Sequence, residues 1–167
     1  DCPDDKVLIK VKACSINHLD IWVRNGIPGL NIPLPLILGS DAFGIIEEVG
    51  SEISSFNIGD SVIVQPGTFS DNCKQSVLGR ENYSKSYGIL GETENGVQAE
   101  YIALDINNVY PMPKHLTYEE AASMPLVFMT SYQMLIKRAD LKPDETVLLY
   151  GATSGIGMAA IQIAKDL

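Results

Sequence analysis

The 167-residue chain has few basic residues, few aromatic residues and no long apolar run. Its 12 lysines and arginines are outnumbered by 21 aspartates and glutamates, which gives a net charge of −9. A nucleic-acid surface needs clustered lysine and arginine to neutralise phosphates, so we expect no nucleic-acid partner. The most apolar segments, IPLPLILG and SMPLVFM, are short and contain proline. We therefore expect no membrane span and no membrane partner.

Cysteine is also scarce. Cys2, Cys14 and Cys73 are odd in number and irregularly spaced, which favours free thiols over a disulfide framework. This usage indicates a reducing compartment, and the cytoplasm is the default expectation. The sequence begins DCPDDK, without an initiator methionine or an apolar leader, which we interpret as a sign of a fragment or a trimmed product.

A glycine-rich turn between two regular elements is the most informative stretch that the chain does contain. Residues 147–150 form an unbroken apolar run, typical of a strand buried on both faces of a parallel sheet. Gly151, Gly155 and Gly157 follow, and apolar residues then recur at helical spacing up to residue 167. A strand, a tight turn and a helix aim backbone N–H groups at one point, as a dinucleotide pyrophosphate requires. The alternative is an ordinary β–α turn in which glycine serves packing only.

Short strands separated by glycine and proline are predicted in the first two thirds of the chain. Residues 6–13 alternate between apolar and mostly charged side chains, which predicts a half-buried strand. Further strands are predicted within 39–50, 61–65 and 99–103. Together these strands predict a small antiparallel barrel. The polar segment 68–85 has no periodicity and is predicted to be a surface lobe.

The character of the chain changes after this β-rich part. Thr117 and Glu120 have the spacing of a capping box, which predicts the start of a helix. Pro125 is expected to interrupt this helix, which then resumes. The sequence therefore predicts a β-rich first part that is followed by the opening of an α/β unit.

Six segments in order carry a resemblance to a known superfamily: VKACSINHLDIWVRNG, PLILGSDAFGIIEEVG, GDSVIVQPG, EYIALD, LTYEEAASMPLVFMTSYQML and TVLLYGATSGIGMAAIQIAK. The chain resembles the medium-chain dehydrogenase/reductase superfamily, also called zinc-containing alcohol dehydrogenases, whose members pair a GroES-like catalytic domain with a Rossmann domain that binds NAD(P). The resemblance implies a mainly β GroES-like barrel domain over residues 1–126. It also implies the first β-α unit of an α/β Rossmann domain, incomplete, over residues 127–167.

The resemblance also implies that the ligands of a catalytic zinc ion are missing. Zinc-dependent members have a cysteine where Asn17 stands, a histidine where Ser40 stands and a third ligand where Leu126 stands. Asp41 takes the place of a glutamate that follows the histidine. An amide, a hydroxyl and an isobutyl group do not hold zinc as thiolate and imidazole do. We therefore expect no catalytic metal.

A structural zinc site is implied to be absent in the same way. Members that contain one carry four cysteines where Ser70, Cys73, Ser76 and Ser84 stand, and a single thiol cannot complete a tetrahedral site. The hydroxyl that such members use for proton relay is replaced by Leu19, which also disfavours alcohol oxidation.

The remaining features resemble the zinc-free quinone oxidoreductase or enone reductase branch, which has asparagine at the position of Asn17 and an aromatic residue at that of Trp22. The implied activity is hydride transfer from a reduced nicotinamide cofactor, NADPH or NADH with NADPH favoured, to a quinone or an α,β-unsaturated carbonyl. Our catalytic candidates are Asn17 as an N–H donor to the developing oxyanion, Asp20, which braces the loop, and Trp22 as an apolar lid. For Trp22 the alternative is a packing role.

The cofactor-binding candidates are the residues of the glycine-rich turn together with three polar side chains. They are Asn17, His18, Thr130, Gly151, Ala152, Thr153, Ser154, Gly155, Ile156 and Gly157. The resemblance further implies a homodimer or homotetramer. Two other functions stay open: a zinc-dependent alcohol dehydrogenase with displaced ligands, and a truncated GroES-like module that binds without catalysing.

Overall fold

The computed structural model describes residues 2–69 and 73–167. The chain forms two compact units, Asp1–Ser123 and Met124–Leu167. The predicted domain division between residues 126 and 127 stays a prediction. In the described ranges no helix is both long and apolar enough to cross a membrane.

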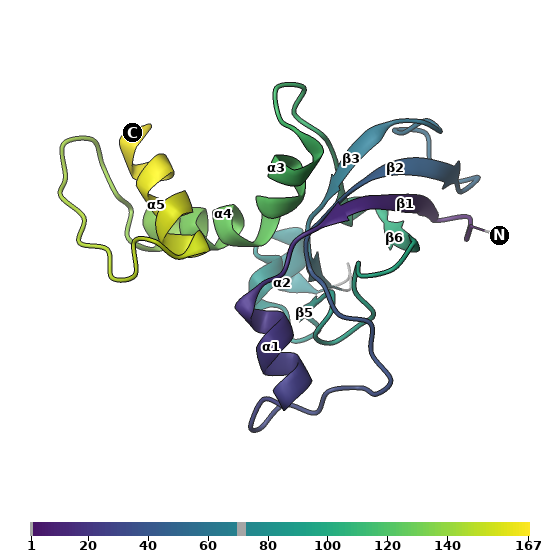
Figure 1. The fold of residues 1–167 in the computed structure, drawn as a ribbon, viewed down its shortest axis with the longest axis horizontal. Coiled ribbons are helices and arrows are strands. Elements are labelled where there is room, and N and C mark those ends of the chain that lie inside the picture. Colours follow the sequence, from purple (N-terminus) through teal and green to yellow (C-terminus); the bar gives the residue numbers. More distant parts are fainter. Residues whose placement is uncertain (1, 70–72) are drawn as a thin grey trace. The chain divides into compact units, whose positions relative to one another are not determined.

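A five-stranded antiparallel sheet forms the centre of the first unit (Figure 1), with the strand order β6-β1-β2-β3-β7. Its strands are β1 (Lys6–Cys14), β2 (Ala42–Val49), β3 (Ser61–Val64), β6 (Tyr101–Asp105) and β7 (Val109–Pro111). This curled sheet agrees with the predicted β-rich first part. A second sheet contains only β4 (Gly67–Thr68) and β5 (Gly88–Ile89).

Strand β1 has the alternation predicted for residues 6–13, and it pairs with β2. Val7 and Ile9 are completely buried, whereas Lys6, Leu8 and Lys10 around them keep partial solvent contact. Ile9 lies against Gly44 of β2, and a Cβ at Gly44 would collide with the Ile9 side chain and the Lys10 carbonyl oxygen. The missing side chain at this position therefore lets the two strands approach each other.

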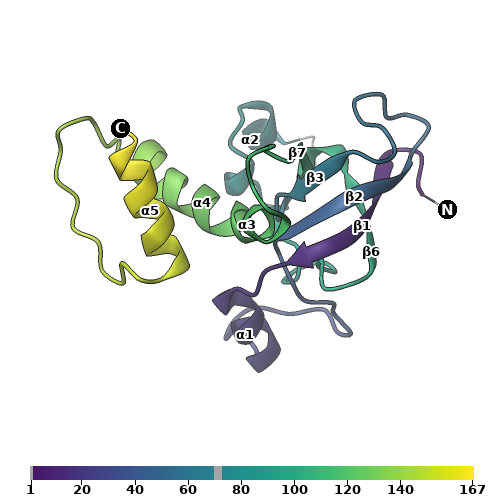
Figure 2. The ribbon, with the colours of Figure 1, turned by 45° about the horizontal axis from the view of Figure 1, so that its top comes forward.

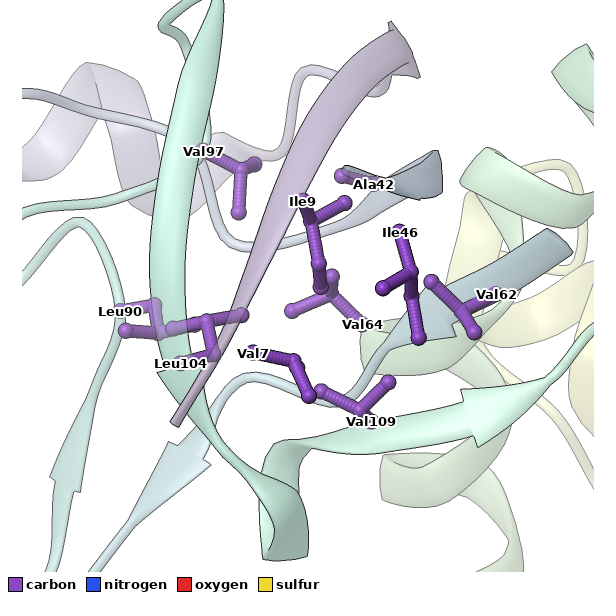
Figure 3. Packing of buried hydrophobic residues seen from close by; sticks show 10 residues of the cluster. All are labelled: Val7, Ile9, Ala42, Ile46, Val62, Val64, Leu90, Val97, Leu104 and Val109. Carbon is purple, nitrogen blue, oxygen red and sulfur yellow. The ribbon is translucent and has the colours of Figure 1, made fainter. Parts of the chain in front are cut away.

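A cluster of buried aliphatic side chains fills one side of the sheet (Figure 3). The side chains come from the strands and from the loop before β6, and they point toward one another. They are Val7, Ile9, Ala42, Ile46, Val62, Val64, Leu90, Val97, Leu104 and Val109. Along β1, β2 and β3 these positions alternate with half-buried residues and with residues of a second buried cluster, so a shift of register would exchange the side chains of the two faces.

Helix α3 (Tyr118–Ser123) packs against β1, β2 and β3 (Figure 2). Phe43, Ala121 and Ala122 form a second buried cluster there. The Phe43 and Tyr118 rings stack with their centroids 4.3 Å apart. The predicted capping box is confirmed: Thr117 N–H donates to Glu120 Oε2 at 2.8 Å, and Glu120 N–H donates to Thr117 Oγ1 at 3.2 Å.

The remaining elements of the first unit are short and connect the strands. They are α1 (His18–Asn25), α2 (Lys74–Val77), η1 (Glu81–Tyr83) and η2 (Ile106–Asn108). The lobe predicted at 68–85 contains α2 and η1, and many of its described side chains are exposed.

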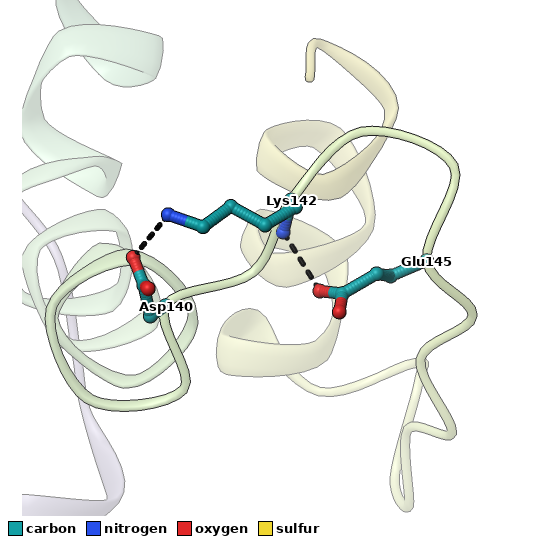
Figure 4. Close-up of polar contacts among 3 residues, drawn as sticks. All are labelled: Asp140, Lys142 and Glu145. Carbon is teal, nitrogen blue, oxygen red and sulfur yellow. Dashed lines mark hydrogen bonds and ion pairs between the residues drawn. The ribbon is translucent and has the colours of Figure 1, made fainter.

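The second unit contains three helical segments: α4 (Pro125–Tyr132), η3 (Gln133–Arg138), which has π-helical hydrogen bonding, and α5 (Gly155–Lys165). The predicted interruption is confirmed, because Pro125 begins α4 directly after Ser123 and Met124. Between η3 and α5 the chain turns at 140–145 (Figure 4). There the Lys142 backbone N–H donates to Glu145 Oε2 at 2.8 Å, and the Lys142 ammonium pairs with Asp140.

The strand predicted at 147–150 is not formed, so only the turn and the helix of the expected β-α unit are present. Leu148 is 78% exposed and Tyr150 is 90% exposed. A strand of a parallel sheet takes its hydrogen bonds from neighbouring strands. No other segment in the described part of the chain pairs with 147–150. The apolar run alone therefore does not make it a strand.

Candidate functional site

The first group of candidate residues lies where β1 leads into α1. The last β1–β2 pair is Cys14 with Ala42, so Ser15 and Asp41 stand next to each other just beyond the paired strands. The Ser15 backbone N–H donates to the Asp41 carbonyl oxygen at 3.2 Å. The register of the sheet thus brings together two segments that are 26 residues apart in sequence.

Asp41 is completely buried and binds the side chains of two residues on the β1–α1 loop. Its Oδ2 accepts hydrogen bonds from Asn17 Nδ2 at 2.9 Å and from Ser15 Oγ at 3.1 Å. Asn17 Nδ2 also lies 3.4 Å from Ser15 Oγ, within the longest range of such contacts. The sequence indicated Asn17 and Asp41 separately, but nothing in their spacing indicated this pairing.

Asp20 connects the start of α1 to the loop before β2. It is only 5% exposed, and its Oδ2 accepts the Asn17 backbone N–H at 2.7 Å. Its Oδ1 accepts the backbone N–H of Gly39 at 2.9 Å. Gly39 has a φ of +94°, and a Cβ there would lie 2.7 Å from Gln98 Cγ, so glycine is needed at this position. Both Asp20 oxygens therefore brace the loop, while a catalytic role for Asp20 stays a prediction.

Trp22 and His18 lie one turn apart on α1. Their ring centroids are 5.9 Å apart, and the Trp22 side chain is 57% exposed. Ile16 and Ile21 add exposed apolar surface, at 78% and 39%. Trp22 is therefore not a core residue, which leaves its ring accessible to a flat ligand. The structure brings Asn17, His18, Asp20 and Trp22 together on one short segment.

The donors at the implied catalytic zinc positions do not fit zinc. Ser40 is completely buried, and its hydroxyl donates to the Leu90 carbonyl oxygen at 2.9 Å. The Asn17 amide nitrogen donates to Asp41, and Leu126 carries no side-chain donor atom. In the ranges that the structure describes, no three His, Cys, Asp or Glu side chains are grouped so that they could hold a metal ion.

Three of the positions implied for a structural zinc site lie together in the lobe. Cys73 Sγ lies 3.2 Å from Ser76 Oγ and 3.2 Å from Ser84 Oγ. Side-chain hydrogen bonding between Cys73 and the hydroxyls of Ser76 and Ser84 lowers the pKa of the Cys73 thiol to about 7, because these hydroxyls stabilise the thiolate. Ser70, the fourth position, lies outside the described residues.

The second group of candidates is the turn at 151–157 in the second unit. Ser154 is the N-cap of α5: its Oγ accepts the Gly157 N–H at 3.1 Å and donates to the Gly151 carbonyl oxygen at 2.8 Å. A Cβ at Gly157 would lie 2.7 Å from Ala152 Cα and closer still to the Gly151 carbonyl oxygen. The helix can therefore begin so close to the turn only because residue 157 is glycine.

Helix α4 supports this turn through a residue that the sequence analysis missed. Ser131 is completely buried, and its Oγ donates to the Ile156 carbonyl oxygen at 2.9 Å. The only feature of the sequence that could have indicated this contact is a serine within an otherwise apolar helix. Thr130, the neighbouring candidate, is exposed, as are Ala152 and Thr153 in the turn.

Comparison with known proteins agrees with this fold. Residues 3–114 match the family described as alcohol dehydrogenase GroES-like domain. The chain is 35% identical to the NAD-dependent alcohol dehydrogenase of Saccharolobus solfataricus, over 96% of this chain and 48% of that protein. It is 33% identical to human quinone oxidoreductase, over 97% of this chain and 41% of that protein.

A solved structure of an NAD-dependent alcohol dehydrogenase superposes with a TM-score of 0.94 at 41% identity, covering 99% of this chain and 48% of the other. The chain thus spans less than half the length of each of these three proteins. The chain belongs to the alcohol dehydrogenase GroES-like family within the medium-chain dehydrogenase/reductase superfamily, whose members are NAD(P)-dependent oxidoreductases.

Proposed function

We propose that this chain is part of an NAD(P)H-dependent oxidoreductase that reduces a quinone or an α,β-unsaturated carbonyl without zinc. One observation carries the proposal: the side chains at the implied zinc positions are an amide and a hydroxyl that hydrogen bond to Asp41 and to Leu90. Neither group provides the soft or imidazole donor that catalytic zinc takes. The printed name of one relative, quinone oxidoreductase, supports the same substrate class.

The turn at 151–157 fits the pyrophosphate of a dinucleotide. Gly151 to Gly155 are exposed, and α5 directs its positive end and its first backbone N–H groups at that surface. Ser154 satisfies the Gly157 N–H, so the N–H groups of Gly155 and Ile156 are the ones we assign to phosphate oxygens. When bound, the reduced nicotinamide supplies a hydride to an electron-poor carbon. We propose NADPH or NADH as the cofactor, with NADPH favoured.

In this proposal the first unit contributes the groups that surround the substrate. The exposed Trp22 ring offers a flat apolar surface that matches a quinone or an enone. Asp20 keeps the β1–α1 loop in place through its two backbone contacts. His18 is exposed one turn before Trp22 and is assigned to the cofactor, as is Thr130 on α4.

A second candidate function is zinc-dependent alcohol oxidation, because two of the compared proteins are named NAD-dependent alcohol dehydrogenases. One experiment on the intact protein distinguishes the two functions. NADPH or NADH is mixed with a quinone or an enone, and NADP or NAD with a primary alcohol, each with and without a chelator, alongside metal analysis. We expect quinone or enone reduction that resists the chelator. Alcohol oxidation that needs stoichiometric zinc, without reduction of quinone or enone, would refute the proposal.

The remaining proposals concern the substrate, the oligomeric state and the cellular compartment. We propose a small-molecule carbonyl or quinone substrate, a homodimer or homotetramer, and the cytoplasm as the compartment. The odd number of cysteines supports a reducing compartment. A truncated module that binds without catalysis predicts no turnover with any of the substrates above.

A further inference from the structure

We propose that Ser131 is a positioning residue that holds the turn at 151–157 in the conformation that offers its backbone N–H groups to a phosphate. This inference rests on the proposed function for the identity of the ligand, a nicotinamide nucleotide bound by its pyrophosphate. Ser131 does not touch that ligand and acts through the Ile156 carbonyl group. All the groups that carry the argument belong to the second unit, Met124–Leu167.

The Ser131 hydroxyl connects two helices. A serine inside a helix often returns its hydroxyl to a carbonyl group in the preceding turn of its own helix. Ser131 is completely buried on α4, and its hydroxyl donates to the Ile156 carbonyl oxygen of α5 at 2.9 Å. A carbonyl oxygen has two lone pairs and the helical hydrogen bond needs one, so the other is available to Ser131. The first turn of α5 is therefore tied to α4 by a specific polar contact.

The peptide group between Ile156 and Gly157 is held at both ends. Its carbonyl oxygen accepts the Ser131 hydroxyl, and its N–H, on Gly157, donates to Ser154 Oγ at 3.1 Å. The Ser154 hydroxyl in turn donates to the Gly151 carbonyl oxygen at 2.8 Å. These three hydrogen bonds form a continuous chain from α4, through the first turn of α5, to the start of the glycine turn. Because hydrogen bonds in a chain polarise and strengthen one another, loss of the first bond weakens the next two.

Helix α4 also approaches α5 through a residue one turn before Ser131. A Cβ on Gly155 would lie 3.0 Å from Val127 Cγ1, so the two helices come this close because residue 155 has no side chain. Val127 and Ser131 are four residues apart and therefore share one face of α4. This face meets Gly155 and Ile156, the two residues whose N–H groups are assigned to phosphate oxygens. Helix α4 thus supports the part of the turn that the ligand would contact.

The chain of hydrogen bonds couples Ser131 to Ser154, and a double-mutant cycle measures this coupling. Binding of NADPH and of NADH to the intact protein is titrated without substrate. Ser131→Ala should weaken binding about three- to tenfold, the value of one neutral hydrogen bond, and Ser154→Ala by at least as much. In the Ser154→Ala background, Ser131→Ala should weaken binding less than about twofold, because the chain is already broken. Two losses that multiply fully in the double variant would overturn the inference.

Ser123→Ala is the matched control for these titrations. Ser123 Oγ donates to the Glu120 carbonyl oxygen at 2.8 Å, so the variant removes the same kind of hydrogen bond from α3 in the first unit. Alone it should leave the affinity for both nucleotides unchanged. Combined with Ser131→Ala, it should give the affinity of Ser131→Ala alone. An equal loss of affinity in Ser123→Ala and Ser131→Ala would overturn the inference.

A second test follows the Gly157 backbone amide by NMR in the ligand-free intact protein. Ser131→Ala should shift the Gly157 amide signal and speed up its hydrogen exchange, because the carbonyl of the same peptide group loses a donor. The amide signal of Ile163, near the other end of α5, should stay unchanged. A merely structural role of Ser131 would instead speed up exchange evenly along α5.

An unchanged Gly157 signal in Ser131→Ala would overturn the inference, whatever the titrations give. Failure of the proposed function has a different signature. In that case neither NADPH nor NADH binds the unmodified protein, while Ser131→Ala still shifts the Gly157 signal and leaves the Ile163 signal in place.

Discussion

Replacement of Asp20 by alanine tests whether one buried carboxylate holds the β1–α1 loop against the loop before β2. Asp20→Ala leaves the buried Gly39 N–H without its acceptor, which costs about 1–3 kcal/mol. It also removes the contact to the Asn17 N–H at the start of α1, a loss of about 1 kcal/mol by analogy with helix caps. The free energy of unfolding of the first unit should therefore fall by about 2–4 kcal/mol.

The assay is urea unfolding of the full chain, followed by the fluorescence of Trp22, the only tryptophan, and by circular dichroism. With a slope of about 2 kcal/mol per molar urea, the midpoint should fall by about 1–2 M. Asp60→Ala is the matched control, because it removes a single exposed contact to Asn57 and should move the midpoint by less than about 0.5 M. Equal shifts for the two variants would refute the reasoning.

Three further predictions concern separate parts of the chain. Gly157→Ala adds a Cβ that collides with the Gly151 carbonyl oxygen and so distorts the turn. We expect cofactor affinity, measured by titration, to fall about tenfold or more. Unchanged affinity would contradict the assignment of the 151–157 turn to the cofactor. The rate of Cys73 alkylation should rise with pH and reach half its maximum near pH 7, the pKa of the thiol, because the thiolate is the reactive form. Ser76→Ala should move this midpoint to higher pH, since it removes a hydroxyl that stabilises the thiolate. An unchanged midpoint would show that the Ser76 hydroxyl does not set this pKa. Phe43→Ala should destabilise the first unit by about 3–5 kcal/mol in the same urea assay, because Phe43 is completely buried; a loss below about 1 kcal/mol would contradict its role in the core.

Local patterns in the sequence predicted local structure well. The alternation at residues 6–13 produces a strand, and Thr117 and Glu120 produce a capping box, because each depends on neighbours within a few residues. The helix after the glycine turn forms for the same reason, with Ser154 as its cap. The run at 147–150 behaves differently: its composition favours a strand, but a strand also needs a partner, and sequence pattern does not supply one.

The candidate site was predictable in its residues and not in its contacts. The resemblance directed attention to Asn17, Ser40 and Leu126 as implied zinc-ligand positions, and to Asp41 in place of the glutamate that follows the histidine. The pairing of Asn17 with Asp41 depends on the register of β1 and β2, which no local pattern specifies. The same holds for Ser131, which contacts Ile156 from a neighbouring helix.

The buried Asp41 side chain supports the β1–α1 loop through its contacts with Asn17 and Ser15. A buried carboxylate without partners is strongly unfavourable, so Asp41 requires donors close to it. Asn17 and Ser15 provide them at 2.9 and 3.1 Å, and in doing so they tie the end of β1 to the start of β2. A residue at position 17 therefore has to satisfy Asp41 as well as any ligand. Asparagine meets the first demand, because its amide nitrogen donates to Asp41 Oδ2 at 2.9 Å.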